Sequence, residues 1–311
     1  MRLPHRSVTV VACTRGRPRG PPCYNRGRVE VERTRHGPFE RLSFAFGTPT
    51  GRSQHSVYRL GDTLIDAGGT VATAELLALL RERPPRRIVC THQHEDHVGN
   101  IAAIRRAFGD LPVYVPRQHV PIVTTTARIP EYRAVYWGHP EPSGPVEPYD
   151  PGAVFEDSSV ALEAVLTPGH TPHHITFVAR DGAASYALTG DLYTSRPLEG
   201  WFESAADDMV ASLRRVAARA PDLVVLPTHG RIKPDGARVL SDMADWIDRE
   251  AERIHEAAER LATRDPRALA AAVYAELGPD IADLGSGGEI SRAGFVRSIL
   301  APNRGLPVDP P

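Results

Sequence analysis

The feature that most constrains this chain is a cluster of three histidines and one aspartate between an apolar run and a helical pattern. The run Ile88-Val89-Cys90 is typical of a short buried strand, and Val98 to Phe108 has helical spacing. The residues between these two patterns include His92, His94, Asp96 and His97. Four polar side chains directly after a buried strand would be costly to bury without ligands or hydrogen-bond partners. The fold must therefore bring metal ions or further polar groups to this turn.

The spacing within the turn divides the ligands between two ions. His92 and His94 are two residues apart, so both can reach one ion from an extended turn. Asp96 and His97 begin the helix and are expected to point toward a second ion. Imidazole and carboxylate are ligands that suit Zn²⁺. A solvent-exposed histidine-rich turn is the alternative, and it explains a bare His-x-His better than the full pattern.

Three more candidate ligands each follow a strand-like run later in the chain. His170 lies in Thr-Pro-Gly-His-Thr, Asp191 in Leu-Thr-Gly-Asp, and His229 in Leu-Pro-Thr-His-Gly. Each alone is equally well explained as a surface or core histidine, or as a turn aspartate. Together they supply one further imidazole for each ion and a carboxylate between the ions. The glycine beside each ligand is expected to let the backbone approach the metal ions.

This ordered set of motifs resembles the metallo-β-lactamase superfamily over about residues 40 to 235, roughly two thirds of the chain. The ligands that the resemblance implies are His92, His94 and His170 for the first metal ion, Asp96, His97 and His229 for the second, and Asp191 as a bridge. It also implies that Asp66 is an early aspartate that orients the ligands. A plain strand-end turn is the alternative for Asp66. Two zinc ions per chain are expected, with iron or manganese as alternatives.

The order of the elements predicts an α/β fold. Strand and helix patterns alternate before a helical tail, which favours two mixed β-sheets flanked by helices in a four-layered αββα sandwich, with a helical C-terminal extension. We expect a disordered basic arm over 1–27, a catalytic domain over 28–235 and the helical extension over 236–311.

Aromatic residues between the ligand segments are candidates for the walls of a substrate pocket. The segment 129–152 is rich in proline and glycine and is expected to be a long loop. The candidate pocket residues are Tyr136, Trp137, Tyr193 and Trp201. Packing is the alternative for each of them. His173 and His174 would face opposite sides of an alternating strand, so a metal-binding role is not favoured for them.

The resemblance implies hydrolysis by a metal-bridging hydroxide, because two cations lower the pKa of a shared water. Asp96 or Asp191 would then help to move a proton toward the leaving group. The ligand set is similar to that of the glyoxalase II, lactonase and RNase Z groups, and the helical tail to that of glyoxalase II. A thioester is therefore the first choice among activated acyl substrates. Lactonase and phosphodiesterase or RNA-processing activities are alternatives, and a non-catalytic metal-binding protein is the alternative class.

Charge and cysteine content bear on partners and location. A net charge of −1 over 311 residues favours a small-molecule substrate over nucleic acid. Three cysteines without regular spacing argue against a disulfide framework. The sequence has no apolar stretch of about 18 residues, so no membrane span is expected. We expect a cytoplasmic protein, and a homo-oligomer is compatible with the sequence.

Overall fold

The computed structural model describes residues 28–49, 51–125, 129–195, 203–286 and 288–301. The chain divides into two compact units, Met1–Leu162 and Glu163–Pro311, which we call the N-terminal unit and the C-terminal unit. The predicted arm over 1–27 lies outside the described residues. The predicted boundary between 235 and 236 stays a prediction.

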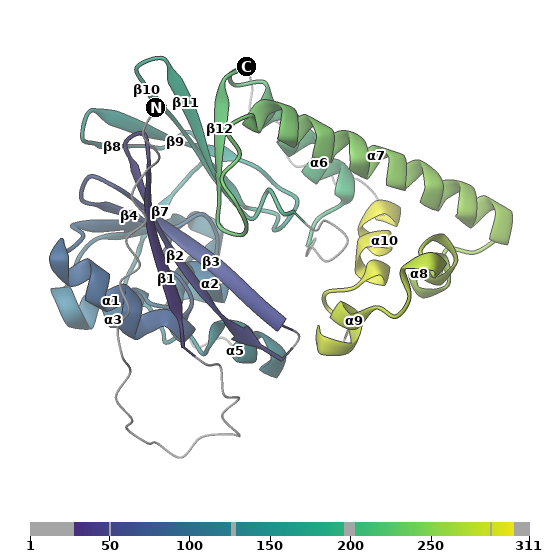
Figure 1. Cartoon of the computed structure of the whole chain (residues 1–311), viewed down its shortest axis with the longest axis horizontal. Helices are drawn as coiled ribbons and strands as arrows, with labels where there is room; N and C mark the ends of the chain where they lie inside the picture. Colours follow the sequence, from purple (N-terminus) through teal and green to yellow (C-terminus); the bar gives the residue numbers. More distant parts are fainter. Residues whose placement is uncertain (1–27, 50, 126–128, 196–202, 287, 302–311) are drawn as a thin grey trace. The chain divides into compact units, whose positions relative to one another are not determined.

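The N-terminal unit is built on a mixed sheet that, within the described residues, has seven strands in sequence order (Figure 1). The strands are β1 (Glu30–His36), β2 (Phe39–Thr48), β3 (Gly51–Leu60), β4 (Thr63–Ile65), β5 (Arg87–Val89), β6 (Val113–Pro116) and β7 (Glu147–Tyr149). Strands β1 to β4 are antiparallel neighbours, and β4 to β7 are parallel. Parallel strands end at the same edge, so the loops after β4 and β5 leave the sheet side by side.

Helices connect the parallel strands of this sheet, as parallel connections require. They are η1 (Thr70–Ala72), α1 (Thr73–Glu82), α2 (Glu95–Val98), α3 (Ile101–Phe108), η2 (Arg117–His119), α4 (Val120–Thr124) and α5 (Glu131–Trp137). Helices α1 and α3 lie next to each other (Figure 1), and Leu76, Leu80 and Ile104 are buried in the same apolar core as Ile88 and Val113. This core supports β5 and the turn that follows it.

The second sheet has the strand order β12-β11-β10-β9-β8 in the part of the chain that the structure describes. Its strands are β8 (Val154–Asp157), β9 (Val160–Leu166), β10 (Ile175–Asp181), β11 (Ala184–Gly190) and β12 (Leu223–Pro227). Strands β10 and β11 form an antiparallel hairpin, whereas β11 and β12 are parallel. The sheet is therefore mixed, and the carboxyl ends of β11 and β12 lie at one edge.

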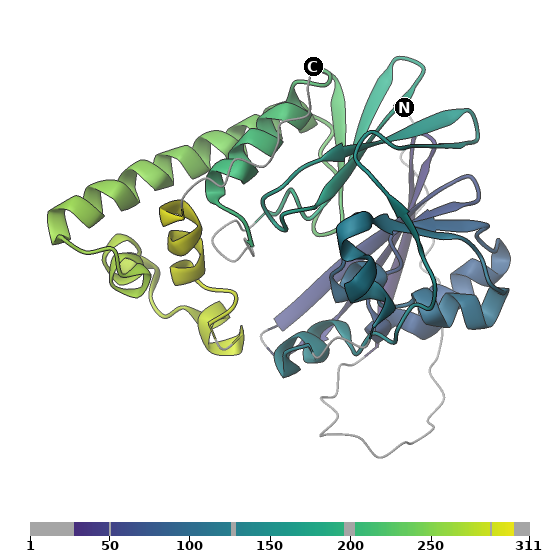
Figure 2. The ribbon, with the colours of Figure 1, turned by 180° about the vertical axis from the view of Figure 1, so that it is seen from behind.

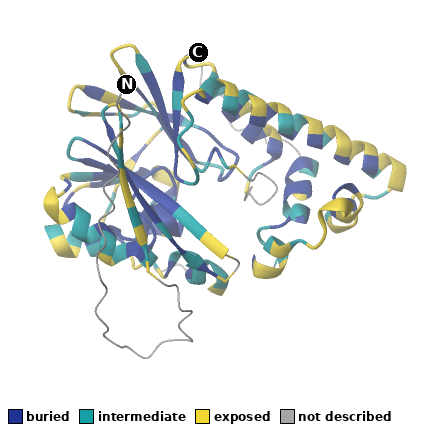
Figure 3. Ribbon diagram, in the orientation of Figure 1, coloured by how far each residue is buried: buried dark blue, intermediate teal, exposed yellow. Residues whose placement is uncertain are grey.

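Helices complete the C-terminal unit. They are α6 (Ala206–Ala217), α7 (Gly236–Leu261), α8 (Pro266–Val273), η4 (Ala275–Leu277), α9 (Ile281–Ser286) and α10 (Arg292–Leu300). Helix α6 runs along α7 in both views (Figures 1 and 2). Buried and exposed residues alternate along α7 with the helical period (Figure 3), and Leu240, Met243, Ile247 and Ile254 are buried on its inner face.

The fold class predicted from the sequence is confirmed. Two mixed sheets, the helices beside them and a helical C-terminal region agree with the four-layered αββα class. Two helices of the C-terminal unit begin at side-chain caps, since the side chain of Asp265 accepts from the N–H of Arg267 and that of Ser291 from the N–H of Gly294.

The prediction of a long loop over 129–152 was wrong in part. This segment contains helix α5 and strand β7. Helix α5 ends where Gly138 adopts φ +83°, a conformation that favours glycine. The proline and glycine residues therefore mark the ends of short elements instead of one continuous loop. Among the described residues, no helix is long and apolar enough to cross a membrane.

Candidate metal centre

The first half of the candidate centre lies where β4 and β5 end. These strands are parallel, with Ile65 paired to Val89, so Asp66 and Thr91 leave the sheet next to each other. The backbone N–H of Thr91 donates to the carboxylate of Asp66 at 2.8 Å, and its hydroxyl donates to the same carboxylate at 3.0 Å. These hydrogen bonds fix the direction in which the following turn begins.

Asp66 also holds His97. Its Oδ2 atom lies 2.8 Å from Nδ1 of His97, and the carbonyl of His97 accepts a hydrogen bond from the N–H of Ala67. Because Nδ1 is engaged, Nε2 is the nitrogen left for a metal ion. This Nε2 lies 3.7 Å from Oδ2 of Asp96. Asp66 has φ +61°, a conformation that costs free energy for a residue other than glycine and is frequent at functional sites.

His92 and His94 bring two imidazole nitrogens together. Nδ1 of His92 lies 3.0 Å from the hydroxyl of Thr91, and its Nε2 lies 3.0 Å from Nδ1 of His94. Both histidines are buried. Two unprotonated nitrogens repel at this distance, so one of them carries a proton unless a cation lies between them. The two nitrogens are therefore close enough to serve as ligands of one ion, and their assignment as ligands stays a prediction.

Two buried residues that were not predicted support the loop over 66–69, which we call the Asp66 loop. Nδ2 of Asn100 donates to the carbonyls of Ala67, Gly68 and Gly69 at 2.9, 3.0 and 2.9 Å. Nε2 of His55 accepts from the N–H of Gly69 at 3.2 Å. Asn100 follows the ligand motif by three residues in the sequence, so its supporting role could have been predicted. His55 lies on a distant strand, and no local pattern marks it.

The C-terminal unit carries the other three predicted ligands in the segments that follow β9, β11 and β12. Strands β11 and β12 are parallel, and Gly190 is paired with Pro227, so Asp191 and His229 follow neighbouring strand ends. Oδ1 of Asp191 lies 3.5 Å from Nε2 of His229, and its Oδ2 lies 3.4 Å from Nε2 of His170. Each carboxylate oxygen of Asp191 thus has its own imidazole neighbour. This arrangement fits a carboxylate that serves two ions.

His174 is a supporting residue that the sequence analysis did not favour. Its Nε2 accepts from the backbone N–H of Asp191 at 3.2 Å, and its Nδ1 lies 2.9 Å from the hydroxyl of Thr167. An accepting Nε2 places the ring proton on Nδ1, so neither nitrogen is left for a metal ion. The expected strand alternation of His173 and His174 was wrong, since β10 begins only at Ile175. Burial lowers the pKa of the half-buried His173.

Helix α6 holds the loop that carries His170. A Cβ on Gly169 would lie 2.8 Å from Cα of Met209, and Gly169 has φ +149°. Next to it, the hydroxyl of Ser212 donates to the carbonyl of Pro168 at 2.7 Å. The glycine at 169 is therefore required by the close approach of α6. That this glycine also lets the backbone approach the metal ions stays a prediction.

The predicted pocket residues have different environments. Trp137 lies on α5 with its ring edge-on to Phe46 and His55, at centroid distances of 6.0 and 5.9 Å. Tyr136 precedes it and is half-buried. Tyr193 is buried in the core of the C-terminal unit, with Nζ of Lys233 5.6 Å from its ring centroid, which supports packing. Trp201 lies outside the described residues.

Two ionisable groups beside the ligands are strongly affected by burial. Burial raises the pKa of Glu95, against the opposing charge of Arg133, whose Nη1 lies 3.3 Å from Oε1 of Glu95. Burial also raises the pKa of the Cys90 thiol well above its usual range. A buried neutral thiol is unreactive, so Cys90 is assigned a packing role.

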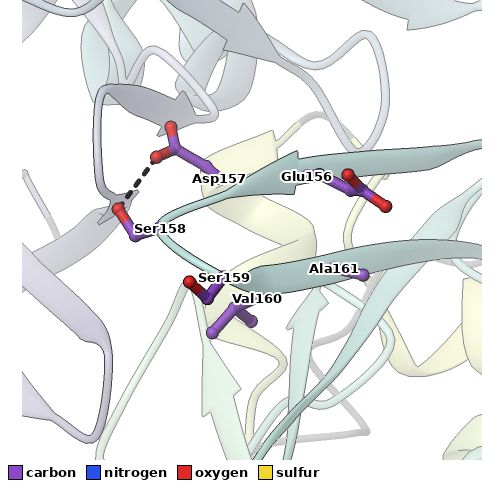
Figure 4. A pocket seen from close by; sticks show the side chains of 6 residues that line it. All are labelled: Glu156, Asp157, Ser158, Ser159, Val160 and Ala161. Atoms are coloured by element: carbon purple, nitrogen blue, oxygen red, sulfur yellow. Dashed lines mark hydrogen bonds between the residues drawn. The ribbon is translucent and has the colours of Figure 1, made fainter.

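A surface cavity of about 420 Å³ lies at the turn between β8 and β9 (Figure 4). It is lined by Glu156–Ala161, a segment that contains none of the predicted ligands. Asp157 at this turn accepts hydrogen bonds from Thr63 and from the N–H of Asp62. The contacts indicate that this turn stabilises the N-terminal unit.

The family model for the metallo-β-lactamase superfamily matches residues 50–229, more than half of the chain. The chain therefore belongs to the metallo-β-lactamase superfamily. All seven predicted ligands lie within the matched residues.

Known relatives and solved structures add detail. A hydroxyacylglutathione hydrolase of Yersinia enterocolitica is 26% identical over 168 residues, which are 53% of this chain and 56% of that protein. The chain thus spans about half the length of the curated relatives it matches. A β-lactamase domain protein from Burkholderia ambifaria superposes with a TM-score of 0.60 at 15% identity, over 88% of this chain and 85% of that one. A metallo-β-lactamase family protein from Thermus thermophilus gives a TM-score of 0.52 at 16% identity, over 84% and 86%. These two likenesses show the fold.

Proposed function

We propose that this protein is a binuclear metal-dependent hydrolase of activated acyl compounds, with a thioester as its substrate. The observation that carries the proposal is the position of the Asp191 carboxylate, which has a different imidazole beside each oxygen, in a chain of this superfamily. Such a carboxylate is suited to lie between two cations. Membership of the family and the order of the ligands in the sequence support the proposal.

The donor set fits a pair of divalent cations. The proposed ligands are His92, His94 and His170 for one ion, Asp96, His97 and His229 for the other, and Asp191 for both. Neutral imidazoles and carboxylates without thiolates suit zinc and also iron or manganese. The hydrogen bonds of Asp66 to His97 and of Thr91 to His92 keep Nδ1 engaged and leave Nε2 for the metal.

When bound, two such cations supply a water of lowered pKa and stabilise negative charge that develops on the substrate. The residues of the chain have the remaining tasks. Asp66, Thr91 and His174 hold ligands in fixed directions, so that little reorganisation is needed during the reaction. Asp96 or Asp191 would accept a proton and pass it toward the leaving group.

A thioester is favoured over the other acyl substrates by the relatives. The matching Yersinia protein is named a hydroxyacylglutathione hydrolase, and its substrate class carries an acyl group on a thiol. A thiolate is a good leaving group and needs less protonation than an alkoxide or an amine. The reaction proposed here therefore depends mainly on attack at the acyl carbon.

The proposal is tested with the full chain reconstituted with zinc, iron or manganese and assayed on a panel of substrates. The panel contains S-lactoylglutathione, a simple acyl-coenzyme A thioester, an acyl-homoserine lactone and bis-(p-nitrophenyl) phosphate. We expect kcat/KM for at least one thioester to exceed that for the lactone and the phosphodiester by about tenfold or more, a difference of roughly 1.4 kcal/mol in activation free energy.

Other outcomes of the panel identify the alternatives. Faster turnover of the lactone or the phosphodiester would show that the proposed substrate is wrong, whereas the assignment as a hydrolase would stand. A protein that holds two metal equivalents and turns over none of the four compounds would contradict the hydrolase and support a non-catalytic metal-binding protein. Salt-sensitive binding to RNA would favour a nuclease.

A further inference from the structure

We propose that the buried ion pair between Glu95 and Arg133 holds α5 against the turn over 92–97. It thereby keeps Asp96 and His97 in position. The inference rests on the proposed function, because it concerns the residues proposed to hold the second metal ion. It assigns a role to two residues that are not among the proposed ligands.

Glu95 lies inside the ligand motif yet points to a different partner. It is the first residue of α2 and precedes Asp96, and its side chain is only 7% exposed. Nη1 of Arg133, on α5, lies 3.3 Å from Oε1 of Glu95, and the Arg133 side chain is 12% exposed. Burying two charges is costly, so the pair persists only if its geometry serves the fold or the site.

Backbone contacts beside the ion pair show that α2, α5 and the Asp66 loop form one packed junction. A Cβ on Gly69 would lie 2.9 Å from the carbonyl oxygen of Trp137 and 3.6 Å from Cα of Asp96. A Cβ on Gly138 would lie 2.0 Å from the hydroxyl oxygen of Thr70. These glycines leave no room for an intervening side chain. A displacement of α5 is therefore transmitted directly to the backbone of Asp96.

The aromatic contacts of α5 connect it to the support of the Asp66 loop. The ring of Trp137 is edge-on to His55, whose Nε2 accepts from the N–H of Gly69. The same loop begins at Asp66, which holds Nδ1 of His97. Helix α5 thus acts on His97 from two sides, through the ion pair to α2 and through Trp137 to the loop.

The chain provides a matched control pair in the same unit. Arg106 on α3 is paired with Glu141, which follows α5, at 2.5 Å, and both side chains are 60% exposed. Exposed pairs contribute little to stability. The comparison of E95Q/R133Q with R106Q/E141Q therefore separates the loss of a buried positioning pair from the loss of any Arg–Glu pair.

The test measures metal equivalents per chain after equilibrium dialysis of zinc-loaded protein against a graded chelator, and the rate of chymotrypsin cleavage within α5. For E95Q/R133Q we expect the more weakly held zinc to be lost at about tenfold or more lower chelator strength, as is typical when support of a ligand is removed. We also expect α5 to be cleaved several-fold faster. The R106Q/E141Q control should match the wild type in both readouts.

A third variant covers the case in which the double variant does not fold. R133K keeps the charge but loses the planar guanidinium. We expect this variant to fold and its affinity for the more weakly held zinc to fall several-fold. If E95Q/R133Q folds and binds zinc as tightly as the wild type, the inference is overturned, whatever the cleavage rate. If the double variant does not fold, R133K decides in its place, and wild-type zinc affinity in R133K overturns the inference. A wild-type chain that binds fewer than two zinc ions would instead contradict the proposed function.

Discussion

Oδ2 of Asp66 lies 2.8 Å from Nδ1 of His97, so a residue at the end of β4 sets the direction of an imidazole on α2. The same carboxylate receives two hydrogen bonds from Thr91 at the end of β5. Because β4 and β5 are adjacent and parallel, the sheet itself brings these groups together. The pairing of β4 with β5 therefore fixes the position of the Asp66 carboxylate, and this carboxylate orients the His97 ring.

Substitution of Asp66 by Asn should weaken metal binding without unfolding the chain. The amide keeps the size of the carboxylate but loses the charge that stabilises the proton on Nδ1 of His97, so we expect zinc affinity to fall by about 10- to 100-fold. Competition with a chromophoric chelator measures the change. Zinc affinity equal to that of the wild type, with unchanged circular dichroism, would show that Asp66 is an ordinary strand-end residue.

His94→Ala removes a proposed ligand and should abolish hydrolysis and lower the metal content. The side chain is buried but lies in a turn, so the fold should survive as judged by circular dichroism. Full retained activity in this variant would contradict the ligand assignment. Ser53→Ala, a half-buried polar change on β3, serves as a control that should keep both metal content and activity.

His174→Leu should destabilise the C-terminal unit and disturb Asp191. The substitution removes the acceptor of the Asp191 backbone N–H, and an unsatisfied buried group costs about 1–3 kcal/mol. Urea denaturation measures the loss of stability. His173→Leu is the control, because it changes the adjacent histidine in the same way. An equal loss of stability in both variants would contradict the specific role of His174.

Gly169→Ala should destabilise the chain more than Gly182→Ala. Both glycines have positive φ, +149° and +59°, but a Cβ at 169 would overlap Met209 whereas a Cβ at 182 would have no atom within 4 Å. Backbone strain alone is expected to cost about 1–2 kcal/mol at 182. Overlap at 169 adds about 1–3 kcal/mol. Equal midpoints of urea unfolding would contradict the close packing of α6.

The turn between β8 and β9 should make stability depend on pH. Burial opposes ionisation of Asp157, but hydrogen bonds from Thr63, Ser158 and the N–H of Asp62 outweigh it and lower the pKa of Asp157 below its ordinary value of 3.8. A lowered carboxyl pKa stabilises the folded chain above the ordinary value, and this contribution is lost as the pH falls through the lower folded value. The stability difference between wild type and D157N should therefore shrink below about pH 4. A difference that stays constant down to pH 2 would argue against these contacts.

Much of the fold could be predicted because local signals were strong. The alternation of strand and helix patterns before a helical tail predicted the αββα class, and two mixed sheets with helices beside them confirm it. Helix α5 was not predicted, because a seven-residue helix between Pro130 and Gly138 gives too short a periodic pattern to detect.

The supporting residues of the site were harder to predict than the ligands. His92 and His94 could be found from their spacing, because both act within one turn. His174 could not, since its partner Asp191 is 17 residues away and the contact depends on how β9, β10 and β11 are arranged. His55 reaches Gly69 in the same way, from another strand of the N-terminal sheet. Such contacts follow from tertiary structure and leave no local pattern.

The central claim is that these side chains hold two metal ions, and elemental analysis of the purified, zinc-reconstituted chain tests it most directly. About two equivalents of zinc per chain are predicted, falling to about one or fewer in Asp191→Ala, because that carboxylate is proposed to serve both ions. A wild-type value near zero, or a value unchanged by loss of Asp191, would contradict the account.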